Sequence, residues 1–216
     1  MDGNQRWSEN NNKSIAEGYS QGLKKLLEIV DILINKNIQN LSVYALSSEN
    51  IKRPNISLIY DLIRNRSRQL IIKLIEEKKV RIRIIGERDN IPNDILKIFE
   101  DAEKIPVNNI LLNLNIAFNY GADGEVISII KQILKKGCKA EEINNTTIKS
   151  LMYLKDSCDP DILIRTGGFQ RLSNFLLLNL KYTELFFTKT LWPDINVNEI
   201  DDILNNYLNI ERKYGL

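Results

Sequence analysis

Short apolar stretches with strand-like spacing alternate with longer helical stripes along the whole chain, and this alternation is the strongest constraint on its fold. Large apolar side chains stand at every second position over 112–118, as in a β-strand. A helical stripe follows over 126–134, and Gly137 suits its C-terminal cap. Strands and helices in alternation are typical of an α/β domain with a mainly parallel sheet. We therefore expect a single domain of this class over residues 1–216.

The other elements follow the same alternation. Apolar spacing predicts helices over 23–33, 57–79 and 200–208, and strands that begin at Leu41, Val80 and Asp161. We interpret these apolar stripes as core-forming surfaces, because side chains at such spacing share one face of their element.

Composition narrows the chemistry that this chain can perform. It contains no histidine, which excludes Ser-His-Asp and Cys-His arrangements and the usual proton shuttle at neutral pH. Thirty basic residues against 28 acidic ones give a formal charge of +2, too balanced to indicate nucleic-acid binding. Cys138 and Cys158 lack a CxxC partner, so the spacing indicates neither a zinc site nor a disulfide framework. Catalysis must therefore use carboxylates, guanidinium groups, hydroxyls, amides or a hard metal ion.

The sequence shows no sign of a membrane span or a secretion signal. No apolar run reaches the roughly 18 residues that a transmembrane helix needs. The first residues, MDGNQRW, are polar and lack the profile of a signal peptide. We therefore expect a cytoplasmic protein.

Polar clusters stand directly after three of the predicted strands. They are SSEN at 47–50, NYG at 119–121 and RTGG at 165–168. In open parallel sheets, the ligand crevice lies at the carboxyl ends of the strands. We therefore expect the three clusters to converge on one site.

The RTGG turn has the composition of an anion site. Arg165 precedes two glycines, whose bare backbone lets N–H groups approach an anion closely. Arg171 and Ser173 follow and add a second guanidinium and a hydroxyl. Arginine binds diphosphate oxygens through two donors at once. The frame of a P-loop is missing, and a solvated surface turn is the alternative reading.

Two carboxylates extend this chemistry. Asp2 stands beside Gly3, with Arg6 close behind, although an Asp-Gly pair can also be a simple turn. Glu184 lies among apolar residues at a strand start, where it is either paired, a metal ligand or merely at the strand edge. With the arginines, these carboxylates indicate a site for Mg²⁺ and a diphosphate, because Mg²⁺ takes few protein ligands and completes its shell with phosphate oxygens.

Six ordered blocks resemble the signature blocks of the cis-prenyltransferases, the family of undecaprenyl diphosphate synthase-like isoprenyl transferases. They are MDGNQRW, LSVYALSSENIKRP, VRIRIIGER, LNIAFNYG, PDILIRTGGFQRLSNFLL and YTELFFTKTLWPD. The resemblance covers the whole chain. It implies a parallel sheet with helices around an apolar product tunnel. It also implies Mg²⁺-dependent transfer of an allylic prenyl group to isopentenyl diphosphate, with cis elongation to a polyprenyl diphosphate.

The resemblance also implies roles for individual residues. Asp2 and Asn50 would be catalytic, and Asp2 and Glu184 would bind Mg²⁺. The allylic diphosphate, such as farnesyl diphosphate, would contact the first block, and Arg165, Arg171 and Ser173 would hold isopentenyl diphosphate. The implied substrate-binding residues are Gly3, Asn4, Gln5, Arg6, Trp7, Tyr19, Ser47, Ser48, Glu49, Arg53, Arg165, Arg171, Leu172 and Ser173.

The family usually forms homodimers, in which each C-terminus reaches toward the partner's site. A homodimer is therefore expected, with no nucleic-acid partner and no transmembrane segment. Peripheral contact with a membrane would suit a lipid product.

The chain departs from the family pattern at several positions. The family has an apolar strand ahead of the MDGN block, and we expect this strand to be missing here or encoded upstream. Ile15 stands where the family has an arginine, and the other replacements are Tyr19, Ile51, Ala122, Asp123, Phe169 and Lys213. A run of arginines at 64, 66 and 68 interrupts a helix that lines the family's tunnel, and it is either solvated or inward-facing.

These departures leave two alternatives to an active enzyme. The first is a weakened or inactive paralogue that stabilises an active partner, suggested by Ile15 and the missing strand. The second is a phosphate- or nucleic-acid-binding module that uses the arginine-rich turn. The balanced charge and the lack of aromatics along a basic stripe argue against this second alternative.

Overall fold

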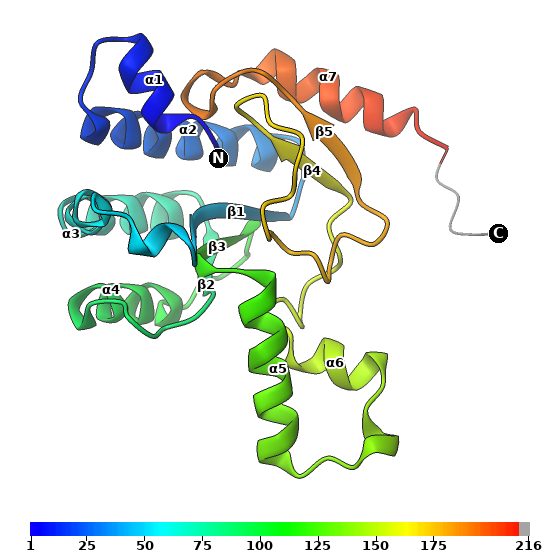
Figure 1. Ribbon diagram of the computed structural model, residues 1–216. Helices are drawn as coiled ribbons and strands as arrows, with labels where there is room; N and C mark the ends of the chain where they lie inside the picture. Colours follow the sequence, from blue (N-terminus) through cyan, green and yellow to red (C-terminus); the bar gives the residue numbers. More distant parts are fainter. Residues whose placement is uncertain (212–216) are drawn as a thin grey trace.

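The computed structural model describes residues 1–211, and the Lys213 position lies outside them. Figure 1 shows the chain from α1 near the N-terminus to α7 near the C-terminus. The helices are α1 (Asn4–Asn10), α2 (Ile15–Asn35), α3 (Ile56–Ile72), α4 (Asn93–Lys104), α5 (Ala122–Lys136), α6 (Asn145–Leu151) and α7 (Val197–Leu208). The strands are β1 (Asn40–Ser47), β2 (Val80–Ile85), β3 (Leu112–Tyr120), β4 (Ile162–Arg165) and β5 (Glu184–Phe187).

Local sequence signals explain where several helices begin and end. The side chain of Ser14 accepts a hydrogen bond from the backbone of Glu17, whose own side chain accepts from the backbone of Ser14, and this capping box starts α2. Gly137 ends α5 with a φ of 65°, as predicted. The helix predicted over 57–79 forms, but its last turn, Lys73–Glu77, widens to a π-helix before β2 begins.

The strands are all parallel, which confirms the predicted α/β class, but they form two sheets. One has the order β1-β3-β2, with Val43 opposite Ile116 and Ile84 opposite the same residue on the other side. The other pairs β4 with β5, with Arg165 opposite Phe187. Within residues 1–211, β1 pairs only with β3, and β4 pairs only with β5.

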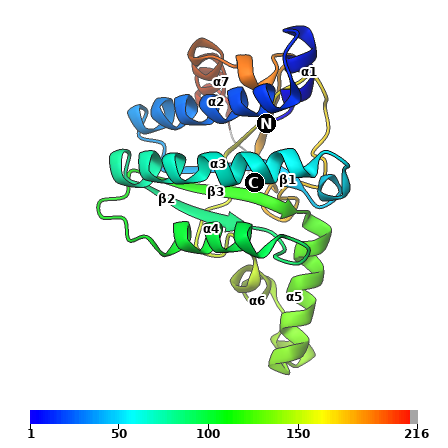
Figure 2. The ribbon, with the colours of Figure 1, turned by 90° about the vertical axis from the view of Figure 1, so that its left-hand side faces the viewer.

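Helices pack beside the first sheet. Figure 2 shows α2, α3 and α4 running beside the β1-β3-β2 sheet, while α5 and α6 project away from it as an arm. The main core lies between this sheet and those helices and includes Leu26, Val30, Ile95, Leu112 and Leu114. Arg64, Arg66 and Arg68 of α3 are exposed on the outer surface, so the arginine run is solvated.

A cavity of about 1440 Å³ lies between the two sheets. Residues of β1 and β4 line it together, along with residues of α2 and the start of α3. Its lining includes apolar side chains of α2, α3 and β1 and the polar residues that follow β1 and β4. Along the described chain, no helix is both long and apolar enough to cross a membrane.

Candidate active site

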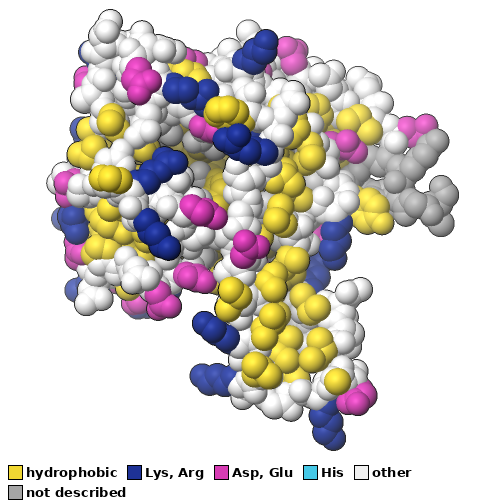
Figure 3. All heavy atoms as spheres, in the orientation of Figure 1, with side chains coloured by type: hydrophobic (Ala, Val, Ile, Leu, Met, Phe, Trp, Pro, Cys, Tyr) yellow, Lys and Arg dark blue, Asp and Glu magenta, His cyan; other side chains and the backbone are white. Residues whose placement is uncertain are grey.

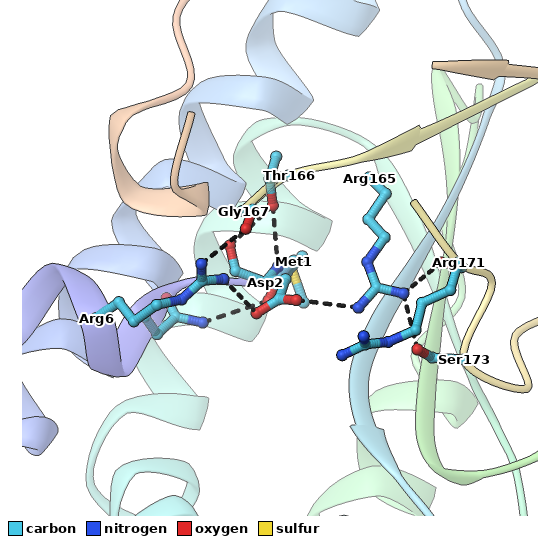
Figure 4. Close-up of polar contacts among 9 residues, drawn as sticks. Met1, Asp2, Arg6, Arg165, Thr166, Gly167, Arg171 and Ser173 are labelled. Carbon is cyan, nitrogen blue, oxygen red and sulfur yellow. Dashed lines mark hydrogen bonds and ion pairs between the residues drawn. The ribbon is translucent and has the colours of Figure 1, made fainter. Parts of the chain in front are cut away.

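The carboxylate of Asp2 lies between two arginines at the polar end of the cavity. Its Oδ1 is 3.1 Å from Nη2 of Arg6, and its Oδ2 is 3.1 Å from Nη2 of Arg165. The two guanidinium groups reach Asp2 from opposite sides (Figure 4). Arg6 comes from α1 and Arg165 from the end of β4, so segments more than 150 residues apart in the sequence build this cluster.

The backbone of Asp2 is fixed by the element that carries Arg165. The hydroxyl of Thr166 accepts a hydrogen bond from the backbone N–H of Asp2 and donates one to its carbonyl oxygen, both at 2.9 Å. The backbone N–H of Trp192 donates to the same carbonyl oxygen at 3.0 Å. Thr166 is buried, so these bonds are shielded from water. These contacts therefore fix the backbone of Asp2, while its carboxylate faces the cavity and pairs with Arg6 and Arg165.

The glycine turn lets Arg6 approach β4. Nη1 of Arg6 donates to the carbonyl oxygen of Gly167 at 2.7 Å. Gly167 has a φ of 85°, and a Cβ there would lie 2.4 Å from Nη2 of Arg6. Glycine is therefore required here both by the backbone conformation and by the close guanidinium.

Arg165 also organises the loop that follows the turn. Its Nη1 donates to Oγ of Ser173 at 2.7 Å and to the carbonyl oxygen of Arg171. Its side chain is only 14% exposed, whereas Arg171 is exposed on the rim. The guanidinium groups of Arg165 and Arg171 both point toward Asp2 (Figure 4). The arrangement places guanidinium donors around a space that suits an anion.

Asn174 joins this loop to two neighbouring turns. Its side-chain amide donates to Oε1 of Glu49 at 3.3 Å and to Oδ2 of Asp123 at 3.4 Å. The backbone carbonyl oxygen of Asn174 accepts a hydrogen bond from the backbone N–H of Ala122 at 2.9 Å. Asn174 has a φ of 62°, a left-handed conformation that asparagine tolerates better than most residues. Asn174 thus links the ends of β1 and β3 to the arginine loop.

The turn after β1 forms the opposite side of the cavity mouth. Oγ of Ser47 accepts from the backbone N–H of Asn50 at 3.2 Å, and Asn50 and Arg53 line the cavity. Burial would raise the pKa of Glu49, but hydrogen bonds from Ser47, its own backbone and Asn174 outweigh burial and lower the pKa. Glu49 therefore stays ionised near neutral pH.

Tyr19 faces the same space from α2. Burial raises the pKa of its hydroxyl, and the positive charge of Arg53 opposes that shift. Tyr19 is therefore a neutral hydrogen-bond donor in the cavity wall, beside a guanidinium.

The cavity brings together most of the residues that the sequence analysis named. Those that line it are Asp2, Gly3, Asn4, Gln5, Arg6, Tyr19, Ser47, Glu49, Asn50, Arg53, Arg165, Arg171, Leu172 and Ser173. Trp7 and Ser48 do not. Trp7 follows Arg6 on α1 and so lies on another face of that helix, where its indole N–H donates to Asp194 at 2.7 Å.

Ser48 is likewise not part of the cavity lining. Its backbone N–H donates to the carbonyl oxygen of Tyr120 at 2.9 Å. Its hydroxyl lies beside Gly121, where a Cβ would come within 2.7 Å of it. Both side chains thus contact neighbouring segments of the protein, and their contact with substrate stays a prediction.

Glu184 does not join Asp2 in one metal site. It is the first residue of β5 and lies opposite Ile162, whereas Arg165 lies opposite Phe187. Three residues of a strand span about 10 Å, so Glu184 sits at the far end of the strand pair from the arginine cluster. The register of β4 against β5 therefore separates Glu184 from the arginine cluster, and its role toward a metal stays a prediction.

The NYG cluster after β3 also takes a supporting position. The side-chain amide of Asn119 donates to the carbonyl oxygens of Glu87 and Asp89, at 3.1 and 3.0 Å. Tyr120 is fully buried, and its hydroxyl donates to Glu125 at 2.5 Å. Only two of the three predicted clusters thus line the cavity. The third is hydrogen-bonded to the turn after β2 and to α5.

The positions that depart from the family pattern have distinct surroundings. Ile15 is the first residue of α2, is 36% exposed and does not line the cavity. Ile51 packs against the main core. The backbone N–H of Asp123 donates to Asn174 at 3.3 Å. Phe169 lies against the arginine cluster.

Within residues 1–211, no group of three or more acidic or cysteine side chains forms a metal cage. The carboxylate of Asp2, beside guanidinium groups at the cavity mouth, nevertheless fits Mg²⁺, which commonly takes one or two protein carboxylates together with phosphate oxygens. Asp2 is the residue that would hold such an ion.

Sequence reasoning gave no site role to Thr166 or Asn174. Thr166 stands within the RTGG motif, and its position beside Arg165 was the available signal. Asn174 follows Ser173 in the same loop. Their contacts with Asp2, Glu49 and Asp123 join residues far apart in the chain, and periodicity does not report such contacts.

Comparisons with known proteins agree along the whole chain. A family model described as "Putative undecaprenyl diphosphate synthase" matches residues 1–215. The sequence is 35% identical over 221 residues to an isoprenyl transferase of Fusobacterium nucleatum, covering 100% of this chain and 93% of that protein.

It is 36% identical over 221 residues to a ditrans,polycis-undecaprenyl-diphosphate synthase ((2E,6E)-farnesyl-diphosphate specific) of Wigglesworthia glossinidia brevipalpis, covering 100% and 85%. The crystal structure of lavandulyl diphosphate synthase from Lavandula x intermedia in complex with dimethylallyl diphosphate has a TM-score of 0.91 at 23% identity, covering 100% of this chain and 95% of that one. That likeness shows a shared fold.

Proposed function

The chain belongs to the undecaprenyl diphosphate synthase family of prenyltransferases, and from this premise we propose that it joins an allylic diphosphate to isopentenyl diphosphate. The product would grow by successive cis-configured isoprene units. The relative from Wigglesworthia is described as farnesyl-diphosphate specific, which makes farnesyl diphosphate the starter that we propose to test.

The Asp2 carboxylate held between Arg6 and Arg165 is the observation that carries this proposal. One guanidinium comes from the N-terminal segment and the other from the β4 turn, so the cluster offers two adjoining anion sites. We propose that Gly3, Asn4 and Arg6 hold the allylic diphosphate and that the loop of Arg165, Arg171 and Ser173 holds isopentenyl diphosphate.

The proposed positions of the two diphosphates suit the reaction, in which one C–O bond breaks and one C–C bond forms. The C–O bond of the allylic diphosphate breaks, and negative charge gathers on the departing diphosphate. The double bond of isopentenyl diphosphate forms the new C–C bond with the electron-deficient allylic carbon. A proton then leaves the new unit, and a diphosphate oxygen or the carboxylate of Asp2 accepts it. Guanidinium donors already in place at the cavity mouth stabilise the departing charge without reorganising.

Mg²⁺, when bound, would neutralise charge on the diphosphate oxygens. Asp2 would hold it, because its carboxylate faces the cavity beside the guanidinium groups that would grip those same phosphates. Asp2 would in this way orient both diphosphates relative to each other.

The apolar wall of the cavity supports a hydrocarbon substrate. Ile29 and Leu33 of α2 and Ile56 and Ile59 of α3 line it. Burying apolar surface there contributes about 25 cal/mol per Å². We propose that the prenyl chain extends along this wall while both diphosphates stay at the mouth.

We also propose that two copies form a homodimer. The arm of α5 and α6 carries a concentration of apolar side chains on the face seen in Figure 3. Val126, Ile127, Ile130 and Leu134 of α5 are 38%, 50%, 51% and 74% exposed. Ile130→Glu should shift sedimentation toward a monomer, whereas Ile72→Glu, at a similarly apolar exposed site on α3, should not.

The test of the catalytic proposal is a chain-elongation assay on the wild-type protein. It is incubated with farnesyl diphosphate and radiolabelled isopentenyl diphosphate, with Mg²⁺ or with excess EDTA. We expect labelled polyprenyl products with Mg²⁺, no product with the chelator, and recovery when Mg²⁺ is added back. Product formation that ignores chelation would overturn the metal assignment. A folded protein that forms no product with Mg²⁺ would favour the alternative that the chain is an inactive paralogue, which serves as a subunit of an active partner.

A further inference from the structure

Phe169 stands in the middle of the arginine cluster, although its ring is 42% exposed. The guanidinium carbons of Arg171, Arg6 and Arg165 lie 4.2, 5.0 and 5.8 Å from the centroid of the ring. All three distances fall within the roughly 6 Å over which an aromatic ring attracts a cation. The ring thus contacts every guanidinium that we assign to the two diphosphates.

The cluster holds three guanidinium groups, those of Arg6, Arg165 and Arg171, around the single carboxylate of Asp2. Asp2 pairs with Arg6 and with Arg165. No ion pair joins Arg171 to a carboxylate of the described chain, and the Phe169 ring is its nearest aromatic partner. Repulsion from two other guanidinium groups favours an Arg171 side chain that moves out into solvent. The electron-rich face of the ring offsets part of that repulsion.

A ring holds an arginine differently from a carboxylate. The N–H donors of a guanidinium point outward in its own plane, and a carboxylate can accept two of them at once. An aromatic face attracts the cation without accepting those donors in the same way. Arg171 therefore keeps its donors available for the oxygens of an incoming anion.

We propose that Phe169 is a positioning residue that holds Arg171 at the cavity mouth, ready to bind the diphosphate of isopentenyl diphosphate. This inference rests on the proposed function for the identity of that substrate. Removing the ring should weaken diphosphate binding by about three- to tenfold, the scale of a cation–π contact at a partly exposed site.

The experiment compares Phe169→Leu, which removes the ring, with Phe169→Tyr, which keeps it. KM is measured separately for isopentenyl and farnesyl diphosphate, and inorganic pyrophosphate is titrated calorimetrically into each protein. We expect Phe169→Leu to raise KM for isopentenyl diphosphate about three- to tenfold with little change in kcat. Phe169→Tyr should restore wild-type values, which a purely structural loss would not predict.

A double-mutant cycle locates the effect. If Phe169 acts through Arg171, Phe169→Leu should have no further effect on KM in an Arg171→Ala background. Additive effects would overturn the proposal, as would an unchanged KM in Phe169→Leu or a loss that tyrosine fails to restore.

The pyrophosphate titration separates this proposal from the function it rests on. If the wild type binds pyrophosphate but forms no prenyl product, the proposed function fails, and weaker pyrophosphate binding by Phe169→Leu still supports the role of the ring. If the wild type elongates chains and Phe169→Leu matches it in both KM and pyrophosphate affinity, only the role of the ring fails.

Discussion

The two parallel sheets of this protein differ in how they are held. Strand β3 pairs on both sides, and seven of its nine residues are buried, so it forms the centre of the main core. In the second sheet, β4 buries one of its four residues and β5 buries none. The first sheet is thus stabilised by apolar burial, while the second depends more on polar contacts with its surroundings.

The residues of the proposed diphosphate sites lie on and beside the less buried sheet. Arg165 ends β4, and Thr166 and Gly167 follow it to contact Asp2 and Arg6. Elements with few buried apolar contacts open locally at low free-energy cost. The comparison teaches that global stability and substrate binding should respond to different substitutions.

The largest expected effect is on stability in the first sheet. Leu114 is fully buried, so Leu114→Ala should lower the free energy of unfolding by about 2–5 kcal/mol through lost burial and a cavity. Leu185 of β5 is 44% exposed, and Leu185→Ala is the matched control, expected to change it by less than about 0.5 kcal/mol. Urea unfolding measures both. If both variants lose the same free energy of unfolding, the two sheets contribute equally to global stability.

The next effect is on turnover. Asp2→Ala should lower kcat by about 10²-fold or more, because it removes the carboxylate between Arg6 and Arg165. The free energy of unfolding, measured in urea, should fall far less in Asp2→Ala than in Leu114→Ala. Asp2→Asn keeps the shape of the side chain and should be nearly as slow. An Asp2→Ala protein that turns over normally but unfolds easily would show that the pair is only structural.

A smaller effect should appear at the join between β4 and Asp2. Thr166→Val keeps the shape of the side chain but removes the hydroxyl that bonds both backbone groups of Asp2, at a cost of about 1–3 kcal/mol. Hydrogen exchange should accelerate at the amides of β4 and stay unchanged at β3. Thr166→Ser retains the hydroxyl and should behave like the wild type. Faster exchange at the β3 amides as well would show that the two sheets do not open independently.

The smallest effect concerns the arginines of α3. Arg64 pairs with Asp61 and Asp94 on the outer surface, away from the cavity. Exposed ion pairs contribute little, so Arg64→Ala should leave both unfolding and chain elongation unchanged within measurement error. Arg66→Ala, exposed on the same helix, is its control. A change in product length for Arg64→Ala alone would place that side chain in the tunnel.

Much of the fold could be predicted because its signals are local. The alternation over 112–118 predicted β3, and the stripe that follows it predicted α5 with its glycine cap. The division into two sheets could not be predicted in this way, because pairing between strands depends on contacts distant in sequence. The π-helical turn at Lys73–Glu77 is likewise set by how α3 meets β2 and not by apolar spacing.

The site could be predicted in part for the same reason. Asp2, Arg6 and Arg165 meet as expected, because two compact motifs carry them to one cavity. Trp7 turns away because one helical position rotates a side chain by about 100°. The position of Glu184 relative to Arg165 could not be predicted, because it depends on the register of β4 and β5, which sequence spacing does not encode.

The most direct test of the central claim, two adjoining diphosphate sites joined at Asp2, is a pair of initial-rate measurements. Arg6→Ala and Arg171→Ala are assayed with each substrate varied while the other is saturating. Arg6→Ala should raise KM mainly for farnesyl diphosphate, and Arg171→Ala mainly for isopentenyl diphosphate, each by about tenfold or more, as expected for a lost charged hydrogen bond. If both variants raise KM for the same substrate, the two arginines serve one anion site, and the division proposed here is wrong.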